Sequence, residues 1–113
     1  MPRLGELERA IMETLWSADE PATARDVQEI LADRSLATTT VLTVLSRLER
    51  KGLVTRERAG RAYRYCSVAS REDHVADLMR DALDAAPDRE AVLARFLGSM
   101  PAAERAAVRD LLG

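Results

Sequence analysis

The most restrictive stretch of this chain runs from residue 38 to residue 65, where a helical pattern changes to a strand-like one within a few residues. Four apolar residues there recur at helical spacing and would form a single stripe: Val41, Val44, Leu45 and Leu48. Hydroxyl and basic side chains occupy much of the remaining helix surface. Gly52 follows Arg50 and Lys51, which is typical of a glycine that ends a helix in a left-handed conformation.

Two short runs with strand character follow this glycine, at residues 53–58 and 61–66, and Ala59-Gly60 is expected to form the turn between them. Tyr63 and Tyr65 would share one side of the second strand, where packing against the core is a better explanation than stacking on bases. A helix with a polar outer face, followed directly by an arginine-rich hairpin, indicates a winged helix-turn-helix.

Charge is distributed unevenly along the chain. The formal net charge is −2 and the pI is about 5.5, which argues against a general polyanion binder. Residues 34–66, however, hold eight basic and two acidic side chains, whereas residues 67–113 hold six basic and nine acidic ones. A basic segment attached to an acidic tail is expected of a module that contacts phosphates over a limited footprint.

Length and composition limit the other possibilities. With 113 residues the chain can build one modest core, or a small domain with a helical appendage. The single cysteine, Cys66, argues against an internal disulfide or a thiolate metal cage, and a half-buried strand residue is a better expectation for it than an oxidant sensor. No apolar run reaches the ~20 residues of a membrane span, and no signal pattern opens the chain, so a cytoplasmic location is expected.

Helical patterns flank the hairpin on both sides. A first helix should end near Ser17, with Trp16 in the core, and Thr23 with Asp26 resembles a capping box that begins a second one. Residues 33–35 are expected to form the turn into the helix that begins near residue 38. Three further helices are expected after Ser70, after residues 86–88 and at Pro101. These patterns predict a mainly α fold with a small β-hairpin, divided into a winged-helix domain at 1–68 and a helical dimerisation region at 69–113.

Residues 4–66 contain a series of short segments in a fixed order: Leu4-Gly5-Glu6-Leu7-Glu8, Ile11-Met12, Leu15-Trp16, Pro21-Ala22-Thr23, Arg25-Asp26-Val27, Thr39-Thr40-Val41-Leu42-Thr43-Val44-Leu45, Arg47-Leu48-Glu49-Arg50-Lys51-Gly52-Leu53-Val54 and Gly60-Arg61-Ala62-Tyr63-Arg64-Tyr65. This series resembles the BlaI/MecI/CopY family of penicillinase and methicillin-resistance repressors. After residue 66 only the helical pattern and a few apolar positions match.

The resemblance implies a repressor that binds a palindromic DNA operator as a homodimer and controls resistance or stress genes, such as a β-lactamase system. In such regulators a membrane sensor-protease relieves repression through cleavage in the dimerisation region, commonly at an Asn-Phe bond. The comparable position here is Arg95-Phe96, which lacks the Asn. Copper control is not expected, because the tail has no paired cysteines.

The residues expected to contact DNA are exposed positions of the helix and the hairpin, namely Thr38, Thr39, Thr40, Leu42, Thr43, Arg47, Arg58 and Arg61. The first threonines could instead cap the helix, and for Thr38 capping is at least as good an explanation. Arg58 and Arg61 could be ordinary solvated charges, although two arginines on a wing favour phosphate or minor-groove contact.

The tail carries more apolar residues than three short helices would leave in water, which predicts a dimer interface. Its expected members are Val75, Leu78, Met79, Leu83, Val92, Leu93, Phe96, Leu97 and Leu111. An alternative function is a winged-helix module that binds a protein partner, which exposed apolar residues on the recognition helix would favour. Leu42 is one such residue, although it could also meet a thymine methyl group.

Catalysis and cofactor binding have little support in the sequence. The glycines form no phosphate-binding loop, and the single histidine, His74, has no second His or Cys at coordinating spacing, so a surface position is expected for it. No metal, no cofactor and no enzymatic activity are therefore expected.

Overall fold

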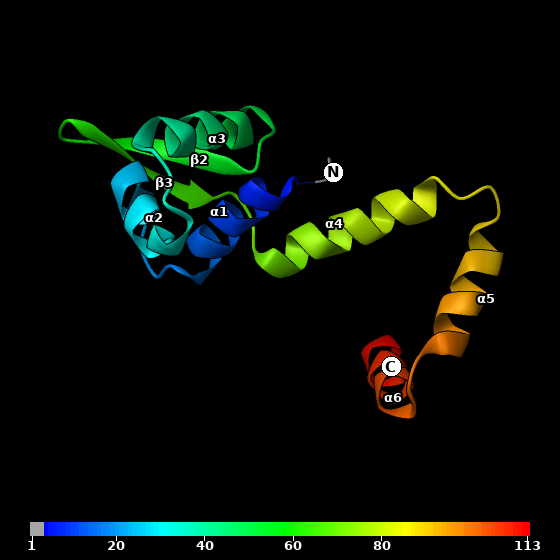
Figure 1. The fold of residues 1–113 in the computed structure, drawn as a ribbon. Coiled ribbons are helices and arrows are strands. Elements are labelled where there is room, and N and C mark those ends of the chain that lie inside the picture. Colours follow the sequence, from blue (N-terminus) through cyan, green and yellow to red (C-terminus); the bar gives the residue numbers. More distant parts are fainter. Residues whose placement is uncertain (1–3) are drawn as a thin grey trace. The chain divides into compact units, whose positions relative to one another are not determined.

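The computed structural model describes residues 4–113 and is mainly helical, with one small sheet (Figure 1). This confirms the predicted fold class. The elements, in chain order, are α1 (Glu6–Ser17), β1 (Ala22–Thr23), α2 (Ala24–Ile30), the 3-10 turn η1 (Ala32–Arg34), α3 (Thr38–Arg50), β2 (Val54–Ala59), β3 (Ala62–Ser67), α4 (Arg71–Asp84), α5 (Arg89–Ser99) and α6 (Ala102–Leu112).

The chain divides into two compact units, and the boundary between them lies inside α4, between Leu78 and Met79. The first unit therefore holds α1 to α3, the whole sheet and the first turns of α4. The second holds the end of α4 with α5 and α6.

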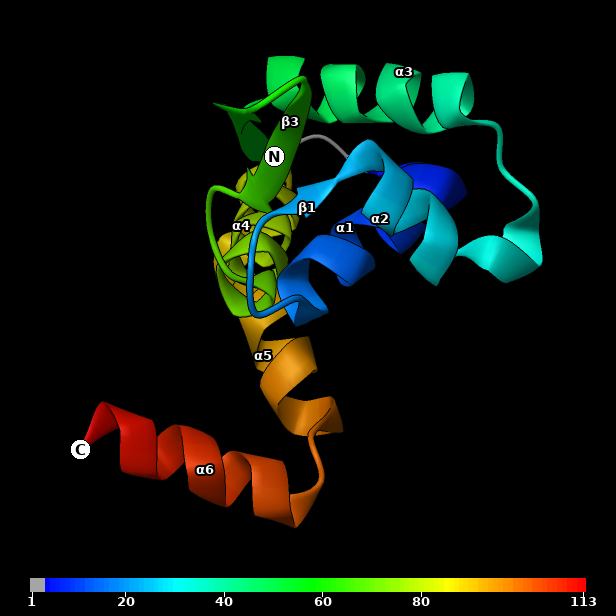
Figure 2. The ribbon, with the colours of Figure 1, turned by 90° about the vertical axis from the view of Figure 1, so that its left-hand side faces the viewer.

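The sheet has three antiparallel strands in the order β1-β3-β2, and Figure 2 shows the short β1 beside β3. The hairpin pairs Ala59 with Ala62, so its two-residue loop is Gly60-Arg61 and not Ala59-Gly60 as predicted. Gly60 has a φ of 65°, and a positive φ at the first of two loop residues is the pattern of a type II′ turn. Both strands therefore begin and end one residue later than predicted, and Arg61 lies at the tip of the hairpin.

The core of the first unit lies where α1, α2 and α3 meet the sheet. Side chains from each of these elements are buried there, among them Ile11, Val27, Leu45, Leu48 and Tyr65. The apolar stripe predicted for α3 is confirmed, because all four of its members are buried. Ile30 of α2 is an exception to the apolar pattern, since it is 60% exposed at the end of its helix.

Local hydrogen bonds explain where the helices of the first unit begin and end. The Thr23 hydroxyl accepts from the Asp26 N–H, and the Asp26 carboxylate accepts from the Thr23 N–H, both at 3.0 Å, which confirms the capping box. At the end of α3, Gly52 has a φ of 79° and its N–H donates to Glu49 O. The Leu53 N–H donates to Leu48 O, which completes a Schellman motif.

Two expectations about aromatic side chains need correction. His74 is 7% exposed, so the expected surface position is wrong. Trp16 is only partly buried at the edge of the core, where its ring centroid lies 5.3 Å from that of His74. The sequence shows His74 among the acidic side chains of its own helix and gives no sign of the surface on which that helix packs.

The second unit contains helices with well-formed ends but no buried side chain on α5 or α6. Asp88 caps α5 through a 3.1 Å hydrogen bond from the Ala91 N–H, and Arg89 pairs with Asp84 at 2.7 Å. Pro101 lies at the N-cap of α6, one residue before its first turn.

Candidate nucleic-acid interface

The outer face of α3 presents hydroxyl and basic side chains in a row. Thr39, Thr40, Thr43 and Arg47 are exposed, and Leu42 among them is 42% exposed. They occur on the side of the helix opposite the buried stripe, because residues three and four apart share a face. This face offers hydrogen-bond donors and acceptors of the kinds that read base edges.

The start of α3 is held by α2 and not by a side-chain cap. The N-cap residue is Ala37, and it makes no side-chain cap, so the alternative that the threonines cap the helix is wrong. The Thr38 hydroxyl instead donates to Gln28 Oε1 at 2.8 Å, and Gln28 Nε2 donates to Leu36 O at 2.8 Å. Gln28 thereby ties the turn and the start of α3 together, a role for which a single glutamine on α2 gives no sequence signal.

The hydroxyls of Thr40 and Thr43 differ in their hydrogen bonding. The Thr43 hydroxyl donates to Thr39 O at 2.8 Å and keeps its lone pairs for an incoming donor. No side-chain hydrogen bond of Thr40 is present within residues 4–113. Within the same range, no carboxylate lies at ion-pair distance from Arg47, so its guanidinium is available to an outside acceptor.

A partly buried ion pair fixes the C-terminal end of α3 to α1. Lys51 Nζ lies 2.7 Å from Glu8 Oε2 and 3.0 Å from Oε1, and the Gly5 N–H donates to the same carboxylate at 2.9 Å. Burial by itself would raise the pKa of Glu8, but the bonds from Lys51 and Gly5, with the positive charges of Lys51 and Arg47, outweigh it and lower that pKa. The carboxylate is therefore ionised at neutral pH and holds the C-terminal end of α3 in place.

The hairpin carries arginines with different partners. Arg56 Cζ lies 4.2 Å from the centre of the Tyr63 ring, and Arg56 Nε lies 3.3 Å from Glu49 Oε2 on α3. Hydrogen bonding to Tyr65 and the charge of Glu49 raise the pKa of Arg56. Arg56 is thus engaged within the protein and braces the wing against α3, a role that its position in the sequence does not indicate.

Arg58 and Arg61 are the arginines nearest the hairpin tip. Arg58 Cζ lies 5.8 Å from the Tyr63 ring centre, and Arg58 Nε donates to Gly60 O at 3.3 Å. Arg61 is exposed in the turn, and no acidic group within residues 4–113 pairs with either arginine. Tyr63 packs against the core, as expected.

The match to known proteins covers the chain from residue 4 to residue 113, which fit the family model of the penicillinase repressor. The chain belongs to the penicillinase repressor family. The transcriptional regulators BlaI of Mycobacterium tuberculosis strains CDC 1551 / Oshkosh and ATCC 25618 / H37Rv are each 50% identical to it over 116 residues, which cover 99% of this chain and 84% of theirs.

Solved structures agree on the fold of this repressor family member. The S. aureus MepR–DNA complex has a TM-score of 0.56 at 20% identity, covering 87% of this chain and 82% of that one. Bordetella bronchiseptica BpsR also has a TM-score of 0.56 at 20% identity, covering 97% and 73%. Family and fold together identify a winged-helix, DNA-binding transcriptional repressor and not an enzyme.

Metal sites and membrane-spanning helices are both absent from the part of the chain that the structure describes. No group of three or more His, Cys, Asp or Glu side chains within residues 4–113 could hold a metal ion. Among the helices of the same range, none has both the length and the apolar character to cross a membrane. Cys66 is half-buried on β3, as expected.

Proposed function

We propose that this repressor reads a palindromic operator as a homodimer, with α3 in the major groove and the hairpin on the adjacent backbone. The observation that carries the proposal is the exposed row of hydroxyls with Arg47 on α3, together with the exposed Arg58 and Arg61 on the wing. The full set of proposed DNA contacts is Thr38, Thr39, Thr40, Leu42, Thr43, Arg47, Arg58 and Arg61.

Within that set, base readout is assigned to Thr40, Thr43 and Arg47. Their side chains leave the buried stripe of α3 and suit contacts with base edges. Leu42 suits a thymine methyl group, so its exposure fits DNA binding as well as it fits a protein partner. Arg58 and Arg61 are assigned to phosphates, because guanidinium groups bind phosphate oxygens at any sequence.

The second unit supports the homodimer. Its helices expose apolar side chains that a single chain leaves in water: Met79 is 54% exposed, Phe96 45% and Leu111 87%. The proposed interface comprises Val75, Leu78, Met79, Leu83, Val92, Leu93, Phe96, Leu97 and Leu111. A symmetric dimer presents two recognition helices to two half-sites, which matches an inverted repeat.

Relief of repression by a membrane sensor-protease belongs to the same proposal. The Arg95-Phe96 bond lies within α5, and cutting there would separate Phe96 from the first half of its helix. A cut at this bond would therefore divide the proposed interface and weaken the dimer. The regulated genes would include a resistance or stress system such as a β-lactamase, and the repressor would act in the cytoplasm.

Selection of DNA fragments by the purified protein, followed by sequencing, tests the proposal directly. The expected result is an inverted repeat. Against that operator, Thr40→Ala and Thr43→Ala should each lose about 1–3 kcal/mol of discrimination and relax one position of the site. Unchanged ratios of operator to random-DNA affinity in both variants would show that α3 is not the reading helix.

A further inference from the structure

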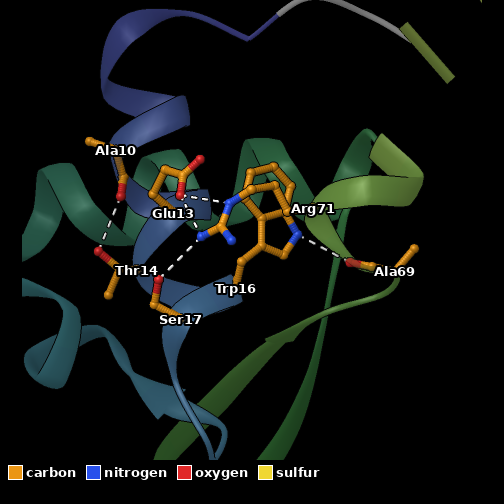
Figure 3. Close-up of polar contacts among 7 residues, drawn as sticks. All are labelled: Ala10, Glu13, Thr14, Trp16, Ser17, Ala69 and Arg71. Carbon is orange, nitrogen blue, oxygen red and sulfur yellow. Dashed lines mark hydrogen bonds and ion pairs between the residues drawn. The ribbon is translucent and has the colours of Figure 1, made fainter. Parts of the chain in front are cut away.

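A set of contacts joins the last turns of α1 to the beginning of α4 (Figure 3). Trp16 Nε1 donates to Ala69 O at 3.1 Å, across 53 positions of the sequence. Arg71 donates to Glu13 Oε2 from Nε at 2.9 Å and from Nη2 at 2.6 Å, and Nη2 also donates to Ser17 Oγ at 3.2 Å. We name these residues, with His74, the α1–α4 junction.

Ring packing adds to these polar contacts. The indole of Trp16 lies against the buried His74 at a centroid distance of 5.3 Å, and Arg71 Cζ lies 5.6 Å from the same indole. His74 is one turn beyond Ser70 on α4, and its N–H donates to Ser70 O. Nδ1 of His74 has no hydrogen-bond partner within residues 4–113, so packing, and not a hydrogen bond, positions that side of the ring.

The segment between the sheet and α4 is short and tied down. Only residues 68–70 separate β3 from α4, and the Val68 N–H donates to Leu53 O at 3.0 Å. Ser70 and Asp73 form a capping box, with the Asp73 N–H donating to Ser70 Oγ at 3.1 Å. The first turns of α4 are consequently part of the DNA-binding unit and not of a flexible linker.

We propose that the α1–α4 junction determines which spacing between operator half-sites this repressor accepts. The inference rests on the proposed function, because it requires two winged-helix units joined through their tails. One extra base pair moves a half-site by about 3.4 Å and turns it by about 34–36° around the DNA axis. If α4 leaves the winged-helix unit in one fixed direction, both units of the dimer can bind at only one half-site spacing. If that direction varies, both units can bind at several spacings.

The junction acts through geometry more than through stability. Glu13 and Arg71 have side chains 47% and 40% exposed, and exposed ion pairs add little to the stability of a fold. Their fork-like contact and the Trp16 bond to Ala69 nevertheless hold the first turn of α4 in one direction relative to α1. The hydroxyl of the neighbouring Thr14 donates to Ala10 O within α1 and so takes no part in these bonds (Figure 3).

The test uses the full chain, the selected operator, and versions of that operator with one or two base pairs added to or removed from the spacer. The parent should prefer its own spacing by about tenfold or more over the altered ones, because avidity disappears when geometry prevents simultaneous binding. In Trp16→Phe/Arg71→Ala this preference should fall to within about twofold, with half-site affinity and dimerisation unchanged. Arg80→Ala, which removes an exposed arginine of α4 outside the junction, should keep the parental preference.

A charge swap separates positioning from simple damage to the fold. Glu13→Arg and Arg71→Glu should each reduce the preference for the parental operator spacing over the altered ones. The double variant, in which the two charges are exchanged, should restore that preference. A folded, dimeric junction variant that keeps the parental preference would overturn the inference, as would a dimeric parent that already accepts every spacing. A parent that is monomeric or binds no operator would instead overturn the proposed function on which the inference rests.

Discussion

The two units differ in how much of their apolar side chains they bury. In the first unit, α1, α2, α3 and the sheet surround a shared core in which Ile11, Val27 and Leu48 are fully buried. In the second, α5 and α6 bury no residue, and Phe96 and Leu111 remain 45% and 87% exposed. The first unit therefore has an internal core, whereas the apolar faces of α5 and α6 are left exposed, as the proposed dimer requires.

Unpaired basic side chains of the first unit gather on α3 and the hairpin. Arg47, Arg58 and Arg61 have no acidic partner within residues 4–113, whereas Arg56 on the same hairpin pairs with Glu49 at 3.3 Å. These two elements are therefore suited to a polyanion, and the exposed apolar faces of the second unit are suited to another protein surface. Substitutions in each unit test this division, beginning with the largest expected effect.

Phe96→Asp should convert the proposed dimer to a monomer, because it places a charge on the apolar face of α5. Affinity for the complete operator should fall by about 10²–10⁴-fold, since two linked half-site contacts become one. Sedimentation velocity and operator titration measure the two effects, and Phe96→Leu should remain dimeric. An aspartate variant that sediments as a dimer at micromolar concentration would remove Phe96 from the interface.

Leu48→Ala should lower the free energy of unfolding of the first unit by about 2–5 kcal/mol, because it leaves a cavity at a fully buried position. Leu111→Ala should leave the stability of that unit unchanged and act only on association, so its effect should depend on protein concentration. Urea denaturation at two protein concentrations distinguishes these outcomes. Equal decreases in stability in the two variants would contradict the distinction between a core within the first unit and an apolar interface on the second.

Glu8→Gln should lower the stability of the first unit by about 1–3 kcal/mol at neutral pH, because it breaks the ion pair with Lys51. The folded state lowers the pKa of Glu8 below its ordinary 4.5, so the contribution is fully present above that pH and is lost as the pH falls through the lowered pKa. Thermal unfolding of parent and variant at several pH values should therefore converge in acid. If the difference in stability between parent and variant stayed constant down to the lowest pH, the ionised Glu8 carboxylate would not be the source of that stability.

Arg58→Ala and Arg61→Ala should each reduce the steepness of the salt dependence of operator binding by about 0.9 in a log–log plot, for each phosphate that the arginine no longer neutralises. Arg105→Ala in the second unit serves as the control and should leave the slope unchanged. If neither wing variant changes the slope or the affinity, the wing does not contact DNA.

Local patterns in the sequence were sufficient for most of the first unit. The α3 stripe, the glycine at position 52, and the Thr23–Asp26 capping box depend on residues within a few positions of one another, so periodicity and capping rules identify them. The same rules predict the hairpin, but they place its turn one residue too early in the sequence. Two neighbouring pairs around Gly60 fit a two-residue loop almost equally well until the strand register is known.

Contacts between distant parts of the chain were decided only by the tertiary structure. Examples are the burial of His74, the hydrogen bond from Trp16 to Ala69 and the ion pair between Arg56 and Glu49. The sequence around these residues gives no sign of the burial or of either pairing. The sequence by itself determined which helix is amphipathic, where it ends and which segment is basic. The tertiary structure decided which charged and aromatic side chains are paired within the protein, and so hold α4 and the wing in place, and which remain unpaired and available to DNA. Burial and pairing depend on surfaces that meet only in the folded chain, so the sequence by itself does not show them.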